Sequence, residues 1–295
     1  MSIHVFGAIL TPLGTAANNR GLTEGNITTL QKLVWNGQVH TTVSAESIRF
    51  ALRRLLAEVE EQGTNRRYNE AERVNEWQDA GFKRWEPKSK ETPFIDDDLL
   101  GFMAAESAKD EQEKGSVKVR RAVLEISRAV SITPWPGDVT FNAASPGATP
   151  SAQKKGGGNP VPYATEMHAT QYQYGFALTP EKLHKPARAV AALEGLVNLG
   201  EVAGNHGRFL FDFSPESIIL RVTADPAPRL LYGFGVENGQ VHANDVVRKA
   251  KAGDIDPKEL VIGGRIAASV KDVLPGATVV DGVKAACAAV LKRIT

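Results

Sequence analysis

Arg49 and Arg53 are the residues whose type and spacing most clearly suit the binding of a charged ligand. On a helix, a spacing of four residues puts both side chains on one face, one turn apart. A planar guanidinium binds phosphate through two parallel hydrogen bonds, so a fixed pair suits a ligand with repeated phosphates. Arg54 lies beside them. An ordinary solvated helix face would show the same pattern, so the arginines alone leave both interpretations open.

The segment that contains these arginines, residues 39–59, reads as a strand that turns directly into an amphipathic helix. Its first five residues alternate at strand spacing. Ser44 is a favourable N-cap, and Glu46 places an anion in the first turn, where the helix dipole favours it. Apolar residues at spacings of three and four predict one buried stripe, formed by Ile48, Leu52, Leu55, Leu56 and Val59.

A polar loop follows the first predicted strand, residues 4–11. Asn18, Asn19 and Arg20 would supply amide and guanidinium donors beside the end of that strand. Such donors suit sugar and phosphate oxygens. A simple turn cluster has the same composition, so the loop alone does not decide between the two.

The GNHG loop at residues 204–207 is a second candidate. Glycines there would let the backbone approach a ligand closely. The loop contributes Asn205 and His206, and the Arg208 that follows could hold a phosphate. The preceding strand, residues 169–178, has an aromatic face that predicts either core packing or a platform on which bases stack.

Residues 133–168 are rich in proline, glycine and small residues. A loop this long inside a compact domain is usually functional or disordered. Lys154 and Lys155 make its middle cationic, and aromatic residues near both ends favour a loop that is pinned at its base and protrudes.

Composition and missing motifs move the weight from catalysis toward binding. A single cysteine, Cys287, excludes an internal disulfide and fits a reducing cytoplasm. No apolar run reaches the length of a membrane span, and the N-terminus lacks the pattern of a targeting segment. There is no Walker A loop, dinucleotide fingerprint, GxSxG elbow or HExxH motif, and the six histidines are scattered. The sequence therefore predicts neither a cofactor nor a metal.

The charge of the chain is unevenly distributed. Residues 58–115 carry 16 acidic and 9 basic residues, a net charge of −7, and the remainder carries 26 basic and 18 acidic residues, a net charge of +8. A basic body suits a polyanionic partner. Residues 60–115 also contain helical patterns and several aromatic residues, which predict a largely helical insertion with a small core of its own.

Two alternatives to the binding of a polyanion without catalysis remain open from the residues. Asp138, or the run Asp96–Asp98, could serve a metal-dependent ribonuclease, although the run lacks the spaced ligands of a calcium loop and suits a solvated helix start. A DNA-binding regulator is less favoured, because no helix-turn-helix with a basic recognition helix is evident.

Four segments together resemble a known family, the CRISPR-associated autoregulators of the DevR type, which form the repeating backbone of Cascade surveillance complexes. The matching segments occur in the family's order and cover much of the chain: ANN at residues 17–19, TTVSAESIRFALR at 41–53, PYATEMHATQYQYGFAL at 162–178 and AGNHGRFLFDFSPESI at 203–218. Residues 60–115 are the least diagnostic part.

The resemblance implies an α+β fold with a ferredoxin-like (RRM-like) palm, a helical fingers insertion and a protruding thumb hairpin. The palm would comprise residues 1–59 and 116–295, the fingers residues 60–115 and the thumb about residues 134–165. The family's function would be that of a backbone subunit without catalytic activity, which oligomerises along CRISPR RNA.

The partners that the resemblance implies are the CRISPR RNA, the target DNA strand paired with it, neighbouring copies in a helical filament and other Cascade subunits, in antiviral defence or RNA-guided transposition. Related type III backbones cut target RNA with a loop aspartate, for which this sequence shows no convincing counterpart. By match of position, the implied RNA contacts are Asn18, Asn19, Arg20, Ser44, Arg49, Arg53, Asn205, His206 and Arg208, with Lys154 and Lys155 in the thumb.

Overall fold

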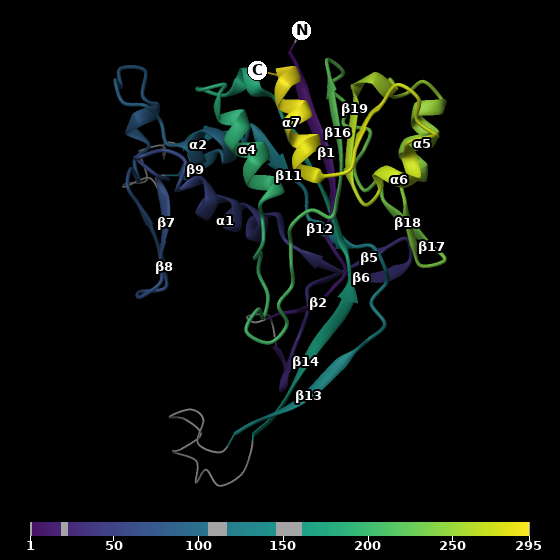
Figure 1. The fold of residues 1–295 in the computed structure, drawn as a ribbon. Helices are drawn as coiled ribbons and strands as arrows, with labels where there is room; N and C mark the ends of the chain where they lie inside the picture. The colour runs from purple at the N-terminus through teal and green to yellow at the C-terminus, as the bar shows by residue number, and fades with distance from the viewer. Residues whose placement is uncertain (1, 19–22, 106–116, 146–160, 295) are drawn as a thin grey trace.

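One large sheet organises the chain in the computed structural model, which describes residues 2–18, 23–105, 117–145 and 161–294 (Figure 1). Its strands lie in the order β20, β19, β16, β1, β15, β12, β6, β5, and β11 also pairs with β15. In chain order these strands are β1 (His4–Leu10), β5 (Lys32–Trp35), β6 (Gln38–Val43), β11 (Leu124–Ile126), β12 (Ala129–Ser131), β15 (Tyr172–Leu178), β16 (Ser217–Thr223), β19 (Leu260–Gly264) and β20 (Thr278–Val280).

Helices cover both faces of this sheet (Figure 1). On one face lie α1, α4 and α7, and on the other α5 and α6. The helices are α1 (Ala45–Leu56), α2 (Ile95–Leu100), α4 (Arg188–Val197), α5 (Asn244–Lys251), α6 (Ala267–Val270) and α7 (Val283–Ile294), with the 3-10 turns η1 (Lys83–Trp85), η2 (Pro180–Lys182) and η3 (Pro257–Glu259). Within the described ranges, no helix has both the length and the apolar character needed to cross a bilayer.

After His4, β1 is apolar because both faces of the strand are buried. Successive side chains of a strand point to opposite sides, so Val5 packs beneath α1, α4 and α7, and Phe6 packs into the second core on the other side. Gly7 accommodates the ring of Phe176 on β15, since a Cβ atom at Gly7 would lie 2.1 Å from the Cε1 atom of that ring. Side-chain bulk is therefore excluded at this point of the sheet.

The central part of the sheet contains two strand–helix–strand connections. α1 lies between β1 and the pair β11 and β12, and α4 lies between β15 and β16. The spatial order of the four strands is β16, β1, β15, β12, and each is antiparallel to its neighbour. The aromatic face of β15 belongs to the core under α1 and α4, because Tyr172, Tyr174 and Phe176 are almost fully buried. It is not a platform for bases.

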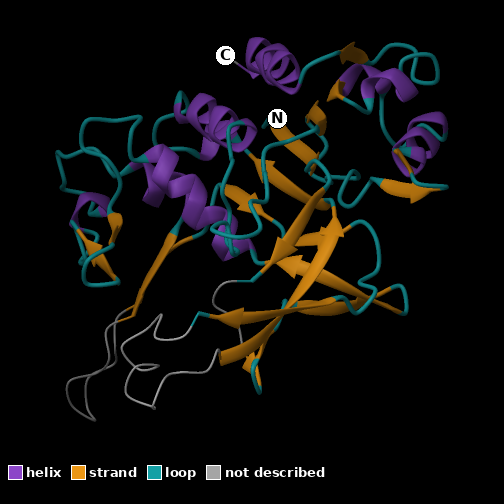
Figure 2. Cartoon of the chain, turned by 60° about the horizontal axis from the view of Figure 1, so that its bottom comes forward, coloured by secondary structure: helices purple, strands orange, loops and turns teal. Residues whose placement is uncertain are grey.

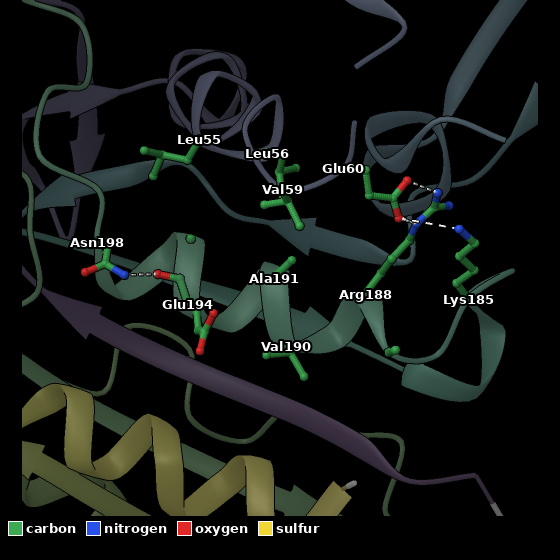
Figure 3. Close-up of a pocket in the computed structure, with 12 residues that line it drawn as sticks. Leu55, Leu56, Val59, Glu60, Lys185, Arg188, Val190, Ala191, Glu194 and Asn198 are labelled. Atoms are coloured by element: carbon green, nitrogen blue, oxygen red, sulfur yellow. Dashed lines mark hydrogen bonds and ion pairs between the residues drawn. The ribbon is translucent and has the colours of Figure 1, made fainter. Parts of the chain in front are cut away.

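The strand and helix predicted around Ser44 are confirmed. β6 ends at Val43, and the Oγ atom of Ser44 accepts a hydrogen bond from the backbone N–H of Ser47 at 3.2 Å, capping α1. The predicted stripe is wrong at two positions, since the side chains of Leu55 and Val59 are 38% and 54% exposed. α1 ends before Val59, and both residues line a hollow of about 390 Å³ between α1 and α4 (Figure 3).

A long antiparallel hairpin, β13 (Val139–Ala144) and β14 (Val161–Thr170), extends away from the helices (Figure 1). Figure 2 brings this lower end of the molecule forward, with the helices above and to the left of the strands. The base of β14 pairs with β2 (Gly14–Ala17), and further along β14 pairs with β4 (Ile27–Thr28), next to β3 (Thr23–Glu24). A separate pair, β17 (Gly235–Glu237) and β18 (Gln240–His242), precedes α5.

The prediction that residues 60–115 are largely helical is wrong for the described part of that segment. It contains the hairpin of β7 (Arg66–Asn69) and β8 (Val74–Trp77), and β9 (Phe102–Ala105), which pairs with β10 (Val117–Arg120). The helical residues there belong to the short η1 and α2. Asn69 explains the turn between β7 and β8, because its Oδ1 atom accepts hydrogen bonds from the backbone N–H groups of Ala71 and Glu72.

Asp96–Asp98 lie in the first turn of α2, as predicted, but the prediction that they are solvated is wrong, since all three are at most 2% exposed. Cations from other elements bind the first and the last of them. Arg53 of α1 pairs with Asp96 at 3.0 Å, and Arg188 of α4 pairs with Asp98 at 2.9 Å. The acidic run therefore fastens residues 60–100 to the helices of the main sheet.

Candidate nucleic-acid interface

Three segments far apart in the sequence meet around one groove of about 530 Å³. The end of β2 contributes Asn18, the start of α1 contributes Ser44, and the GNHG loop contributes Gly204. Each segment belongs to one of the candidates identified from the sequence. The structure therefore brings together residues that the sequence could only propose separately.

The GNHG loop is held against the end of β2 by its backbone. The N–H group of Asn205 donates a hydrogen bond to the carbonyl oxygen of Ala17 at 2.9 Å. Gly204 has a φ of +115°, and a Cβ atom there would lie 3.1 Å from the same Ala17 oxygen. A side chain at this position would be strained and crowded, so glycine allows the close approach.

Two side chains of this loop are suited to a ligand. Both ring nitrogens of His206 are shielded from solvent yet have no hydrogen-bond partner among the described residues, which is costly unless a ligand completes them. The guanidinium of Arg208 lies over the ring of Tyr163, near the start of β14 and away from the base of the hairpin, 4.8 Å from the ring centre. Stacking of this kind orients the guanidinium and leaves its charge uncompensated.

The groove meets a different face of α1 from the one predicted. Ser47, Phe50 and Arg54, at spacings of three and four, line it. Arg49 lies outside this lining, 3.7 Å from Glu46 across an ion pair. The guanidinium of Arg53 forms an ion pair with Asp96.

Arg54 and Arg128 are cations near this site that sequence reasoning did not assign to it. Arg54 is exposed and makes no ion pair in the described part of the chain. The Nη1 atom of Arg128 donates to the Oε1 atom of Gln31 and the Oγ1 atom of Thr42, both at 3.1 Å, and both residues line the groove. Because these acceptors are neutral, they hold the guanidinium in place without neutralising it.

Asn18 joins the groove wall, where its Nδ2 atom donates to the carbonyl oxygen of Thr29 at 3.2 Å. Other members of the predicted set, Asn19, Arg20, Lys154 and Lys155, lie outside the described residues. Their contacts stay predictions.

A buried polar network holds the base of β14 beside this groove. The Nδ1 atom of His168 lies 2.7 Å from the Oγ1 atom of Thr41, which lies 2.9 Å from the hydroxyl of Tyr172. Burial lowers the pKa of His168 to about 4, so the ring is neutral near pH 7. Sequence reasoning missed this network, which links β6, β14 and β15.

The hollow between α1 and α4 has a different character, as Figure 3 shows. Its wall is mainly apolar, and its cations are already paired. Arg188 binds both carboxylate oxygens of Glu60, and Lys185 lies 3.8 Å from the same carboxylate. This hollow therefore offers no free guanidinium to a phosphate.

The model of the CRISPR-associated negative auto-regulator DevR/Csa2 family matches residues 12–187, more than half of the chain. The chain belongs to the DevR/Csa2 family. A CRISPR-associated protein Cas7/Cst2/DevR of Myxococcus xanthus (strain DK1622) is 67% identical over 300 residues, which cover 100% of this chain and 98% of that protein.

Solved structures show that this DevR/Csa2-family chain shares its fold with subunits of known assemblies. A chain of a CRISPR RNA-guided surveillance complex, pre-nicking, aligns over 99% of this chain and 100% of its own length, with a TM-score of 0.61 and 13% identity. A chain of another CRISPR RNA-guided surveillance complex covers 98% of this chain and 100% of itself, with a TM-score of 0.55 and 15% identity. The predicted family and the mixed α+β class are confirmed.

Proposed function

We propose that this DevR/Csa2-family chain is a backbone subunit without catalytic activity that binds CRISPR RNA in the groove between β2, α1 and the GNHG loop. The observation that carries the proposal is the meeting of Asn18, Ser44 and Gly204 around one groove, beside guanidiniums with no carboxylate partner. Neutral amide and hydroxyl groups with fixed cations suit a sugar–phosphate backbone and carry little base specificity. Affinity would then come largely from phosphates and fall with salt.

The division into palm, fingers and thumb forms part of the proposal. The palm would comprise residues 1–59 and 116–295. Its ferredoxin-like character is supported by the two strand–helix–strand units and by the strand order β16, β1, β15, β12. The fingers would be residues 60–115, a segment that contains the β7–β8 hairpin and is not largely helical in its described part. The thumb, about residues 134–165, would correspond to the projecting hairpin of β13 and β14.

The proposed partners are neighbouring copies of this chain in a helical filament, the target DNA strand that pairs with the guide, and other Cascade subunits. In the cytoplasm, such a filament would present the guide for pairing, in antiviral defence or RNA-guided transposition. A subunit that grips the backbone and leaves base edges free suits this function, because pairing then reads the sequence.

The ribonuclease alternative is not favoured by the position of the carboxylates. Asp96 and Asp98 are buried and bound by arginines, so they are not free to hold a metal. Asp138 is exposed near the base of the hairpin, and the described residues contain no group of three potential ligands around a metal position. Metal-assisted cleavage of phosphodiesters relies on such a group.

The test is to purify the chain from cells that also express a CRISPR array and the other complex subunits, and to sequence the RNA that comes with it. Discrete CRISPR RNA in a large assembly is expected. The variants Arg128→Glu and Arg208→Glu should each weaken binding of that RNA about tenfold or more. Lys251→Glu, an equal charge change at an exposed position on α5, should leave binding unchanged. A nucleic-acid-free monomer from all preparations would refute the proposal.

A further inference from the structure

The RNA groove continues past α1 into a second hollow of about 290 Å³, between α1 and the β7–β8 hairpin. The two hollows share four lining residues, Phe50, Arg54, Tyr68 and Glu70. The two hollows are therefore adjacent, and a strand that leaves the first reaches the second next. Sequence reasoning assigned no ligand to this part of the fingers.

Guanidiniums are concentrated in the second hollow. Four arginines line it, whereas its carboxylates are Glu58 and Glu70. The Nε atom of Arg66 donates to the Oδ1 atom of Asn75 at 3.1 Å, and the Nη2 atom of Arg67 donates to the carbonyl oxygen of Gln62 at 3.2 Å. These neutral acceptors hold both guanidiniums in place, and neither arginine makes an ion pair in the described residues, although the charge of Asp96 stabilises Arg66 from farther away.

Like charges are crowded here. Arg53 extends into the hollow beside Arg66, and burial together with the charge of Arg53 lowers the pKa of Arg66. Asp96 binds Arg53, so one of the four charges is balanced internally. The remaining three, on Arg54, Arg66 and Arg67, have no ion-pair partner within the described ranges. Bringing an anion into the hollow would relieve their mutual repulsion.

An aromatic pair lies where the two hollows join. The rings of Phe50 and Tyr68 meet edge to face, with centres 5.7 Å apart and planes at 80°. Phe50 lines both hollows and is 36% exposed, so its ring is accessible to a ligand from either side. An exposed ring next to fixed cations is the combination on which single-stranded nucleic acids stack their bases.

We propose that Phe50, Tyr68, Arg54, Arg66 and Arg67 form a nucleotide subsite that holds one base against the aromatic pair and the adjoining phosphate against the guanidiniums. Its occupant is the same RNA strand as it leaves the groove of the palm. This inference rests on the proposed function. It adds a base-contacting element to a site that otherwise reads the backbone, and it makes the β7–β8 hairpin part of the RNA path.

Continuity with the first groove favours RNA as the occupant over an acidic peptide. A peptide carboxylate would satisfy the guanidiniums and leave the aromatic pair unused. A nucleotide satisfies both, because its base and its phosphate are linked at a fixed separation.

The experiment uses the assembled complex loaded with guide RNAs that carry 5-iodouridine at successive positions. Photo-crosslinking to Tyr68 is expected at guide positions that recur with the footprint of the subunit. In parallel, binding of single-stranded guide RNA to the purified chain is measured as a function of salt. The double variant Phe50→Leu and Tyr68→Leu keeps apolar bulk but removes both rings, and should weaken binding about fivefold or more.

In a plot of the logarithm of the RNA-binding constant against the logarithm of the salt concentration, Arg67→Gln should make the negative slope shallower by about 0.7, the value for one phosphate contact on a single strand. Lys251→Gln is the control for loss of one exposed charge and should leave the slope unchanged. Unchanged affinity and slope in the fingers variants, with binding still lost in Arg128→Glu, would overturn the subsite and leave the proposed function standing. Crosslinks from iodinated target DNA in place of the guide would overturn the RNA assignment. Failure of the unaltered chain to bind RNA would overturn both.

Discussion

Two adjacent buried aspartates should respond to the same substitution in opposite directions. The side-chain donors that reach the Asp97 carboxylate in the described residues are neutral: the Nδ2 atom of Asn65 donates at 3.0 Å, and the indole of Trp85 also acts on it. Burial, followed by the charge of Asp96, raises the pKa of Asp97 to about 7. Replacing Asp97 with Asn keeps an oxygen for the amide of Asn65 and removes the charge. We expect Asp97→Asn to stabilise the protein.

The magnitude follows from the two pKa values. An aspartate in the unfolded chain has a pKa of about 3.9, so between about pH 4 and pH 7 the folded protein holds a proton that the unfolded chain has released. The free energy of unfolding therefore falls as the pH rises through this interval, by at most about 1.4 kcal/mol per pH unit. The variant avoids this loss and should be more stable by about 2–4 kcal/mol at pH 8. At pH 5, the difference in the free energy of unfolding between the variant and the unaltered chain should be less than half of its value at pH 8.

Asp98 provides the matched control, because it is equally buried but surrounded by charged donors. Its Oδ1 atom accepts from Arg120 at 2.6 Å, and its Oδ2 atom accepts from Arg188 at 2.9 Å. The backbone N–H groups of His184 and Lys185 complete its shell. Asp98→Asn would leave Arg120 without its carboxylate partner and Arg188 with only one of its two, so it should lower the free energy of unfolding by about 3–5 kcal/mol.

The assay is urea unfolding of the RNA-free chain and both variants at pH 5, 6.5 and 8. The reasoning about Asp97 fails if Asp97→Asn is no more stable than the unaltered chain at pH 8. It fails equally if the gain does not depend on pH, because a gain from packing alone would be constant. Similar losses in both variants would mean that the two carboxylates share one environment.

Two further predictions separate structure from binding. Folding lowers the pKa of His168 to about 4 from an ordinary value near 6.5, so the free energy of unfolding should fall by about 3 kcal/mol as the pH falls through that interval. His168→Gln should flatten this part of the curve of stability against pH, and an unchanged slope would contradict the assignment. Arg53→Gln should lower the free energy of unfolding by about 3 kcal/mol, since it leaves Asp96 without its cation. Arg54→Gln should leave urea unfolding unchanged but weaken RNA binding. Equal effects of the two variants on stability would contradict the assignment of Arg53 to structure and Arg54 to binding.

Local patterns were sufficient to predict the elements that depend on local physics. The first strand (β1), the alternation that predicts β6 and the N-cap at Ser44 all occur in the structure as expected. Each of them is determined by neighbouring residues in the chain. The family resemblance added the correct family and the correct α+β class.

Long-range pairing explains what the sequence could not show. The aspartates of α2 seemed solvated because charged residues are rarely buried without partners, and their partners Arg53, Arg120 and Arg188 lie 43, 22 and 90 residues away. Likewise, helix periodicity assigns Arg49 and Arg53 to one flank of α1 and Phe50 and Arg54 to the next. Which flank meets a groove depends on where β7, β8 and the GNHG loop pack.

α1 therefore connects the stability of the fingers with the shape of the proposed RNA path. One flank of the helix binds Asp96 through Arg53 and so fixes the segment that leads into β7. The adjacent flank presents Phe50 and Arg54 to the groove, and Tyr68 of β7 forms its opposite wall. Because both walls are positioned by the same buried ion pair, loosening that pair would widen the groove without removing any of the proposed RNA contacts on Phe50, Tyr68 or Arg67. Loss of RNA binding in variants of Asp96 or Arg53 would accordingly report on the position of the hairpin, and only variants of Phe50, Tyr68 or Arg67 test the contacts themselves.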